Sequence, residues 1–180
     1  LFPNGEQINI NRLAELNVDI FSPCAAPSSI RLDNANHVAA RIISPGANVP
    51  TTPEAEEILF HRGILSIPDF VANCGGALGV SMEFAGLKEA FVKHFIDQRF
   101  GQKVAEMLKA VETKGIIPRD YAVKIAKERF LTVKEKAERK NITNGVFRFG
   151  LELYRRRLIP SYLTRLVAPV YFEHTLLGHS

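Results

Sequence analysis

Three short apolar runs stand out in the first 70 residues, and a turn-forming residue follows each of them. The runs are Val18–Ser22, Arg41–Ser44 and Ile64–Ile67, followed by Pro23, Pro45 and Pro68. Short runs rich in branched residues with such boundaries are typical of buried strands. Helix-like stretches, 29–40 and 52–59, lie between the runs. Strands and helices in alternation predict right-handed crossovers and a parallel sheet.

The second helix-like stretch has a well-marked start. Thr52 is a suitable N-cap, Pro53 suits the first helical position, and Glu54 and Glu56 place acids where the helix dipole favours them. Gly63 is suited to the end of this helix. The sequence therefore predicts a helix that begins at Pro53.

After residue 70 the pattern becomes helical. Residues 88–111 and 121–140 have helical periodicity with polar faces, and Gly115–Pro118 separates them. A turn is predicted at Asn141–Gly145. The tail that follows contains Arg155-Arg156-Arg157 and six aromatic residues: Phe147, Phe149, Tyr154, Tyr162, Tyr171 and Phe172. An α/β part followed by a helical region is expected.

The net charge changes sign near residue 87, close to where the helical pattern begins. Residues 1–87 contain four Lys or Arg and nine Asp or Glu, whereas residues 88–180 contain 19 and 10. The net charges are thus −5 and +9. We expect two domains, 1–87 and a basic helical region at 88–180. The basic residues indicate either solvated helix faces or a surface for an anionic partner, and nucleic acid is not an expected partner because no zinc-ligand spacing or RNA-binding motif accompanies them.

The composition indicates the cellular compartment in which we expect the protein. No run approaches the ~18 apolar residues that span a bilayer, so no membrane association is expected. The two cysteines, Cys24 and Cys74, are too few for a disulfide scaffold, which favours a reducing, cytoplasmic setting. We interpret both as small buried residues and not as a nucleophile or redox pair.

Residues suited to a ligand follow each predicted strand. They form three clusters: Pro23–Ala26, Gly46–Ala55 and Pro68–Gly76. Ligands of open parallel sheets bind beyond the carboxyl ends of the strands. Small residues let a flat ligand approach the backbone, Asn offers both a donor and an acceptor, and a Gly-Gly pair at a helix start exposes N–H groups. Gly and Asn are also ordinary turn residues, but three clusters at equivalent positions predict a nucleotide-type crevice.

The three clusters carry a family resemblance. Phe2 to about Gly86 resembles the second half of the nucleotide-binding domain of the glutamate/leucine/phenylalanine/valine dehydrogenases. The motifs that carry it are Val18–Ala25, Gly46–Ala55 and Pro68–Gly76, with Glu83 ten places after Asn73. From Leu87 to about Lys140 the match is generic. The resemblance implies an α/β fold made of the C-terminal half of a Rossmann-like parallel sheet, followed by a helical region.

The resemblance also implies a reaction and site residues. The reaction is reversible oxidative deamination of an amino acid to a 2-oxo acid, with hydride transfer to NAD or NADP. The implied cofactor-binding residues are Ala25, Ala26, Gly46, Ala47, Asn48 and Asn73, and Asn73 also reaches the substrate region. Alternative interpretations remain for two of them: Asn48 caps the segment 50–55, or Asn73 only starts a helix.

Several features depart from the family pattern. The phosphate-binding G-x-G-x-x-G is absent from this sequence, and so is the substrate domain that carries the family's catalytic Lys and Asp. Pro45 stands where the family usually has Glu, and Ser28 where it usually has Asn. We therefore expect a C-terminal fragment of the enzyme, with no catalytic residue in this chain and no activity of its own.

Val80 bears on the substrate. Glutamate-specific members of the family have a Ser at the corresponding place, seven residues after the Asn of Asn-x-Gly-Gly, and Ser81 comes one position late here. A Val would leave a substrate carboxylate unpaired, so an apolar amino acid is the expected substrate. The other interpretation of Val80 is a core residue of a helix.

Two hypotheses about the chain remain. In the first it is part of a dehydrogenase, whose family generally forms homo-oligomers. In the second it is a non-catalytic descendant that acts as an interaction or regulatory module, through the basic helices and the aromatic tail, since exposed aromatics favour association.

Overall fold

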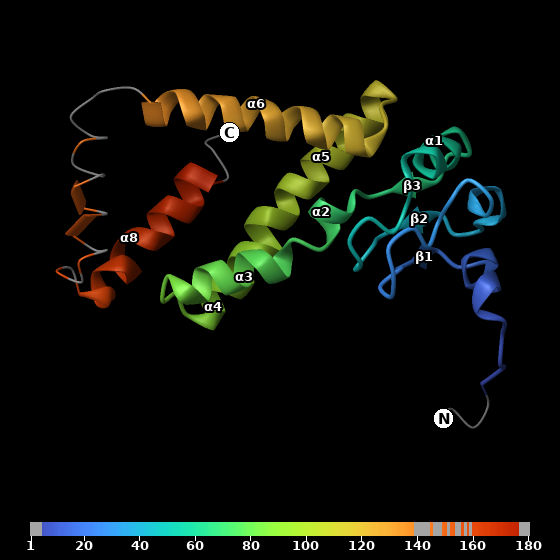
Figure 1. Cartoon of the computed structure of the whole chain (residues 1–180), viewed down its shortest axis with the longest axis horizontal. Helices are drawn as coiled ribbons and strands as arrows, with labels where there is room; N and C mark the ends of the chain where they lie inside the picture. Colours follow the sequence, from blue (N-terminus) through green and yellow to red (C-terminus); the bar gives the residue numbers. More distant parts are fainter. Residues whose placement is uncertain are drawn as a thin grey trace. The chain divides into compact units, whose positions relative to one another are not determined.

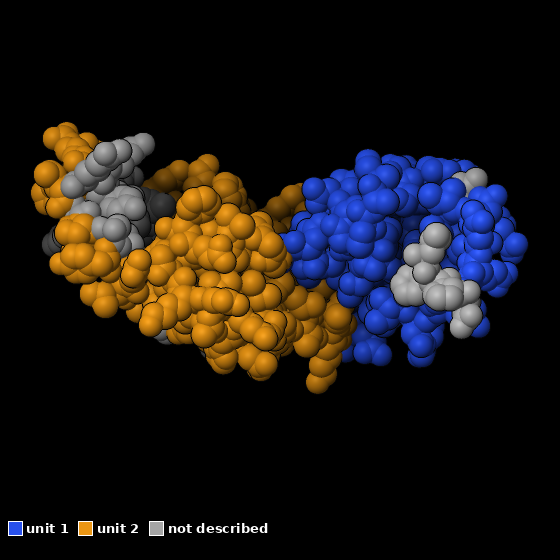
Figure 2. Space-filling model, turned by 90° about the horizontal axis from the view of Figure 1, so that it is seen from below, with its two compact units in different colours: residues 1–74, 111–122 blue, residues 75–110, 123–180 orange. Residues whose placement is uncertain are grey.

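The structure is a computed structural model. It describes residues 5–138 and, toward the C-terminus, residues 145, 149–150, 152–153, 156, 158 and 160–176. The chain divides into two compact units (Figure 2). Unit 1 comprises Leu1–Cys74 and Val111–Ala122, and unit 2 comprises Gly75–Ala110 and Val123–Ser180. The predicted domains 1–87 and 88–180 stay a prediction, because a compact unit is not by itself an independently folding domain.

Unit 1 contains a small parallel sheet. Its strands are β1 (Ile20–Phe21), β2 (Ile42–Ile43) and β3 (Leu65–Ser66), in the order β1-β2-β3 (Figure 1). Ile42 of β2 pairs with Ile20 on one side and Leu65 on the other. Each strand lies inside one of the three predicted runs. The predicted α/β fold with a parallel sheet is therefore confirmed.

The connection from β1 to β2 differs from the prediction. The helix-like stretch 29–40 contains a single short 3-10 turn, η2 (Ala35–His37). The side-chain oxygen of Asn34 accepts the N–H of Arg31 at 2.7 Å, and its amide donates to the carbonyl of Ser29 at 2.9 Å. Asn side chains that bond nearby backbone groups in this way compete with helix formation. Ile30, Ala35, Val38 and Ala40 of this stretch are buried all the same and join the core, whereas Leu32 is exposed.

The connection from β2 to β3 is the predicted helix, α1 (Pro53–His61). The Thr52 side chain accepts the N–H of Ala55 at 3.4 Å, and Gly63 follows the helix at a φ of +72°. A positive φ is a conformation that glycine adopts without a steric penalty. The core of this region consists of Ile30, Ala35, Val38, Ala40, Ile43, Ala55 and Leu59.

Two further elements complete unit 1. A short 3-10 helix, η1 (Ile10–Glu15), precedes β1, and the single turn α2 (Asp69–Ala72) follows β3. The end of α5 (Gly101–Lys114) and the start of α6 (Pro118–Glu138) also belong to this unit. Val111 and Ala122 are buried on either side of this corner.

Unit 2 is helical in its described residues. It contains α3 (Gly75–Phe84), α4 (Glu89–His94), the π-helical η3 (Phe95–Phe100), most of α5 and α6, η4 (Ser161–Leu163), α8 (Thr164–Val170) and the π-helical η5 (Tyr171–Leu176). Its core consists of Met82, Val92, Phe95 and Phe172. The predicted helices after residue 88 are thus confirmed. None of the helices in the described residues is long and apolar enough to cross a bilayer.

The aromatic tail is described only in part. Phe149, Tyr162 and Tyr171 are exposed, but Phe172 is buried against the ring of Phe95, with 6.1 Å between the ring centroids. Residues 141–144 of the predicted turn Asn141–Gly145 lie outside the described residues, as do Phe147, Tyr154, Arg155 and Arg157.

Candidate functional site

The loops that follow β1 and β2 are joined by their backbones. The N–H groups of Gly46 and Ala47 both donate to the carbonyl of Pro23, at 3.2 and 3.0 Å. A Cβ added at Gly46 would lie 2.6 Å from the Cys24 sulfur, so a larger residue at this position would displace the Cys24 side chain. Glycine at residue 46 therefore leaves room for Cys24 where the two loops meet.

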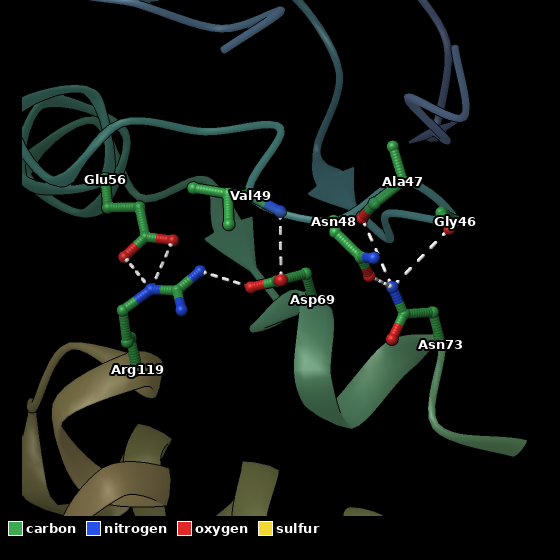
Figure 3. A network of polar contacts seen from close by, with 8 residues as sticks. All are labelled: Gly46, Ala47, Asn48, Val49, Glu56, Asp69, Asn73 and Arg119. Carbon is green, nitrogen blue, oxygen red and sulfur yellow. Dashed lines mark hydrogen bonds and ion pairs between the residues drawn. The ribbon is translucent and has the colours of Figure 1, made fainter. Parts of the chain in front are cut away.

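Asn73 attaches the segment after β3 to the same loop. Its side-chain amide donates to the Asn48 side-chain oxygen at 2.9 Å and to the carbonyls of Ala47 at 3.3 Å and Gly46 at 3.5 Å (Figure 3). Asn73 is the C-cap of α2, and its N–H donates to the carbonyl of Asp69. One amide group thus holds three consecutive residues of the loop that follows β2.

Asp69 holds the next residue of that loop. It stands four positions before Asn73, and residues with that spacing lie on one face of a helix. Its Oδ2 accepts the N–H of Val49 at 3.0 Å, while the Val49 carbonyl accepts the N–H of Ser28 at 2.8 Å. Val49 has a φ of 49°, an uncommon conformation for a β-branched residue. Hydrogen bonds on both sides of Val49 stabilise this conformation.

Arg119 lies at the other oxygen of Asp69. Its Nη2 donates to Oδ1 of Asp69 at 2.7 Å, and its Nε lies 2.9 and 2.7 Å from the two carboxylate oxygens of Glu56 (Figure 3). The guanidinium also lies 5.5 Å from the centroid of the Phe70 ring. The exposed fractions of the side chains are 26% for Arg119, 6% for Glu56 and 9% for Asp69. Arg119 therefore neutralises two buried carboxylates from two different elements.

The charges of this network are set by competing effects. Burial alone would raise the pKa of Asp69, but the N–H of Val49 and the guanidinium of Arg119 outweigh it, so the pKa lies below its ordinary value. The Glu56 carboxylate raises the pKa of Arg119 against the opposing effect of burial, and Asp69 adds to the rise. Both groups are therefore charged at neutral pH.

The structure gathers four of the predicted cofactor-binding residues in one place: Gly46, Ala47, Asn48 and Asn73. Ala25 and Ala26 are exposed in the loop after β1, where the carbonyl of Ala26 accepts the hydroxyl of Ser29 at 2.6 Å. The alternative in which Asn48 caps the helix is wrong, because Thr52 is the cap of α1. The binding roles of these residues stay predictions.

Val80 belongs to a different unit from the four gathered residues. It belongs to α3 of unit 2, and its exposed fraction is 52%, so its interpretation as a core residue is wrong. Its predicted part in substrate choice stays a prediction.

The cysteines differ from each other. Cys24 is exposed, so the expectation that it is buried is wrong, and Cys74 is half-buried. Burial raises the pKa of the Cys74 thiol, which argues against a reactive thiolate. In the described part of the chain no group of His, Cys, Asp and Glu could hold a metal ion.

Sequence reasoning missed the Arg119 network. The sequence places Asp69 in the cluster that follows the third strand and Glu56 in the first turn of a helix, without a partner for either. A signal was present, because Asp69 directly follows a buried strand and a proline, and a buried carboxylate needs a cation. Nothing in the sequence indicates which of the many basic residues supplies it.

Comparisons of the whole sequence and fold relate this chain to known proteins. A family model described as glutamate/leucine/phenylalanine/valine dehydrogenase matches residues 2–139. Glutamate dehydrogenase from Thermotoga maritima is 35% identical over 134 residues, which cover 71% of this chain and 32% of the relative. Glutamate dehydrogenase from Aeropyrum pernix is 36% identical over 138 residues, or 71% and 33%. The chain thus spans about a third of the length of these relatives.

Two solved structures share the fold. L-tryptophan dehydrogenase from Nostoc punctiforme matches with a TM-score of 0.61 and 28% identity, over 69% of this chain and 38% of that one. A hetero-hexameric glutamate dehydrogenase from Thermus thermophilus matches with a TM-score of 0.62 and 23% identity, over 70% of this chain and 32% of that one.

Proposed function

The chain belongs to the glutamate/leucine/phenylalanine/valine dehydrogenase family, and we propose that it forms the nicotinamide side of the cofactor cleft in a longer amino acid dehydrogenase. The cofactor is NAD or NADP, and the reaction is the reversible oxidative deamination of an amino acid. The relatives support this proposal, because two glutamate dehydrogenases match this chain over about a third of their own length.

One observation carries the proposal. The amide of Asn73 bonds Gly46, Ala47 and Asn48 at the carboxyl edge of the sheet, where open parallel sheets bind ligands. The available groups fit a nicotinamide and its ribose. Ala25, Ala26 and Gly46 are exposed and small, and Asn48 is exposed with an amide group.

The bound nicotinamide would supply the hydride acceptor. The residues of this chain would orient it: the backbone of the loop after β2 lies beside it, and Asn73 holds that loop in place. We expect no turnover by the chain alone, because it contains no predicted proton-transfer group or G-x-G-x-x-G fingerprint.

The substrate proposal concerns a neutral, apolar amino acid. Val80 offers no partner for a second carboxylate, and a relative of 28% identity is a tryptophan dehydrogenase. We also propose a cytoplasmic homo-oligomer as the assembly of the whole enzyme. The module hypothesis is the rival, and the sequence encoded upstream of Leu1 distinguishes the two: a G-x-G-x-x-G fingerprint after a Lys-bearing domain supports the enzyme.

Titration with half-cofactors tests the proposed cleft. We expect nicotinamide mononucleotide to bind at millimolar concentration and to shift the amide NMR signals of residues 46–48 and the Asn73 side chain. Adenosine monophosphate should leave them unchanged, because its half of the cofactor binds at the absent fingerprint. The substitution Asn73→Ala should abolish the shifts, while Asn36→Ala, an exposed asparagine of the same unit, should not.

Two results would contradict the proposal. One is the absence of any shift at these residues with nicotinamide mononucleotide, and the other is an equal response to adenosine monophosphate. Formation of NADH above background by the chain mixed with NAD and amino acids would contradict the expected lack of turnover.

A further inference from the structure

A residue far along the chain lies close to the proposed cleft. Arg119 is 63 residues after Glu56 and 50 residues after Asp69, yet all three belong to unit 1. It stands in the first turn of α6, just after Pro118, and the whole corner 111–122 lies in that unit. Asp69, which belongs to the motif Pro68–Gly76, therefore has its counter-ion in a segment outside the three motifs.

The contacts form a continuous path from Arg119 to the loop after β2. The two oxygens of Asp69 have separate partners, since Oδ1 accepts from Arg119 and Oδ2 accepts from Val49. Rotation of this carboxylate would therefore break at least one of the two bonds. Glu56 fixes the guanidinium of Arg119 from the other side, because its carboxylate accepts from the Nε of Arg119 (Figure 3).

The same loop is held at two points by α2. Asp69, at the first residue of α2, bonds Val49, and Asn73, at its C-cap, bonds Asn48 and the residues before it. Val49 needs its bond to Asp69 more than an ordinary residue would, because its left-handed φ is unfavourable for a β-branched side chain. A displaced Asp69 would release Val49 and with it the neighbouring Asn48.

We propose that Arg119 is a positioning residue for the loop Gly46–Val49: it orients Asp69, which holds Val49 and so keeps Asn48 against Asn73. The role of that loop in cofactor binding rests on the proposed function. The polar contacts described for Arg119 are those with Glu56 and Asp69, so its effect on the loop passes through Asp69. A planar guanidinium suits this task because it donates to two carboxylates in fixed directions, which a lysine ammonium does not.

The first test is Arg119→Lys in the full chain, which keeps the charge and removes the fork. We expect the backbone amide signal of Val49 and the side-chain amide signals of Asn73 to shift. The affinity for nicotinamide mononucleotide should fall about fivefold, the size expected for one misplaced hydrogen bond. The matched control is Arg41→Lys, whose exposed partner Asp19 is also distant in sequence. It should change neither the signals nor the affinity.

A double-mutant cycle separates positioning from general support. If Arg119 acts through Asp69, the shift at Val49 caused by Arg119→Lys should largely disappear in an Asp69→Asn background. Equal shifts in both backgrounds would overturn the proposal. A lowered melting temperature with unchanged Val49 and Asn73 signals would overturn it as well, because that is the result of a purely structural ion pair.

A second variant tests the proposal even if Arg119→Lys does not fold. Glu56→Gln leaves Arg119 and Asp69 in place and weakens only the contact that fixes the guanidinium, so smaller shifts at the same two residues are expected. The proposed function fails separately: a wild-type chain that does not bind nicotinamide mononucleotide contradicts it, while the shifts at Val49 and Asn73 still decide the role of Arg119.

Discussion

Both units have an apolar core, but buried polar residues occur only in unit 1 among the described residues. The buried polar residues in the described part of the chain are Thr51, Glu56, Ser66 and Asp69, and all four lie in unit 1. The buried residues described in unit 2 are apolar: Met82, Val92, Phe95 and Phe172. The ion pairs described in unit 2 join side chains that are one third or more exposed and that stand three or four residues apart in the sequence.

The difference shows where directional chemistry is concentrated. Apolar contacts hold helices together without fixing the direction of any one group. Buried charges and amides must be paired, so they fix positions and orientations. The network from Arg119 to Asn73 is of the second kind and lies at the proposed cleft. Unit 1 is therefore expected to respond to small changes of polar groups as well as to changes of core volume, and unit 2 mainly to changes of core volume.

The largest expected effect is in the core of unit 2. Phe95 is fully buried and lies 6.2 Å from the ring of Phe91 and 6.1 Å from that of Phe172, measured between centroids. The substitution Phe95→Ala should lower the free energy of unfolding of unit 2 by about 3–5 kcal/mol. Amide hydrogen exchange, resolved by residue, measures it. The control Phe84→Ala removes a ring that is 88% exposed and should change little. Equal loss of protection in β2 and β3 would show that the two units unfold together and would break the comparison.

The next effect is in unit 1. Arg119→Ala leaves two buried carboxylates without their counter-ion, and breaking a buried pair in this way costs roughly 3 kcal/mol. The loss should appear in the exchange of β2 and β3 amides. The exposed pair of Arg41 and Asp19 provides the control, since Arg41→Ala should cost only about 0.2–1 kcal/mol. Similar losses for both substitutions would mean that the buried network contributes no more to the free energy of unfolding than an exposed ion pair does.

The smallest effect is on the pH dependence of unit 1. The pKa of Asp69 is below its ordinary value in the folded chain, so its stabilising contribution is present above the unfolded pKa of about 3.9 and is lost as the pH falls below it. We expect wild type to be more stable than Asp69→Asn at pH 6, and the difference to shrink by pH 3. Urea midpoints of the β2 and β3 amides at the two values measure it. A difference that stays constant would contradict a charged Asp69.

The strands and α1 were predictable because their signals are local. Thr52-Pro53 and Gly63 mark the two ends of α1 in the sequence itself, and short apolar runs before prolines mark the strands. The stretch 29–40 was mispredicted because four of its apolar residues, Ile30, Ala35, Val38 and Ala40, are buried without forming an α-helix. There the Asn34 side chain bonds the backbone of Arg31 and Ser29, and such competition depends on geometry that composition does not reveal.

The site was predictable in part. Gly46, Ala47, Asn48 and Asn73 could be brought together because parallel strands end at one edge of a sheet. The ion pairs that support these residues could not be predicted, because the pairing of Arg119 with Glu56 and Asp69 depends on where α6 begins in space. Long-range pairs of this kind leave no periodic pattern. The exposure of Cys24 likewise follows from the path of the loop after β1 and not from the residue type.

The late position of Arg119 has a consequence for synthesis on the ribosome. Glu56 and Asp69 are translated 63 and 50 residues before the cation that neutralises them. A nascent chain that ends before α6 can form β1, β2 and β3, but to bury these two carboxylates it would have to leave them unpaired. Closing a loop of that length also costs conformational entropy that local contacts do not. The proposed cofactor loop is therefore expected to be completed only after the start of α6 has left the exit tunnel.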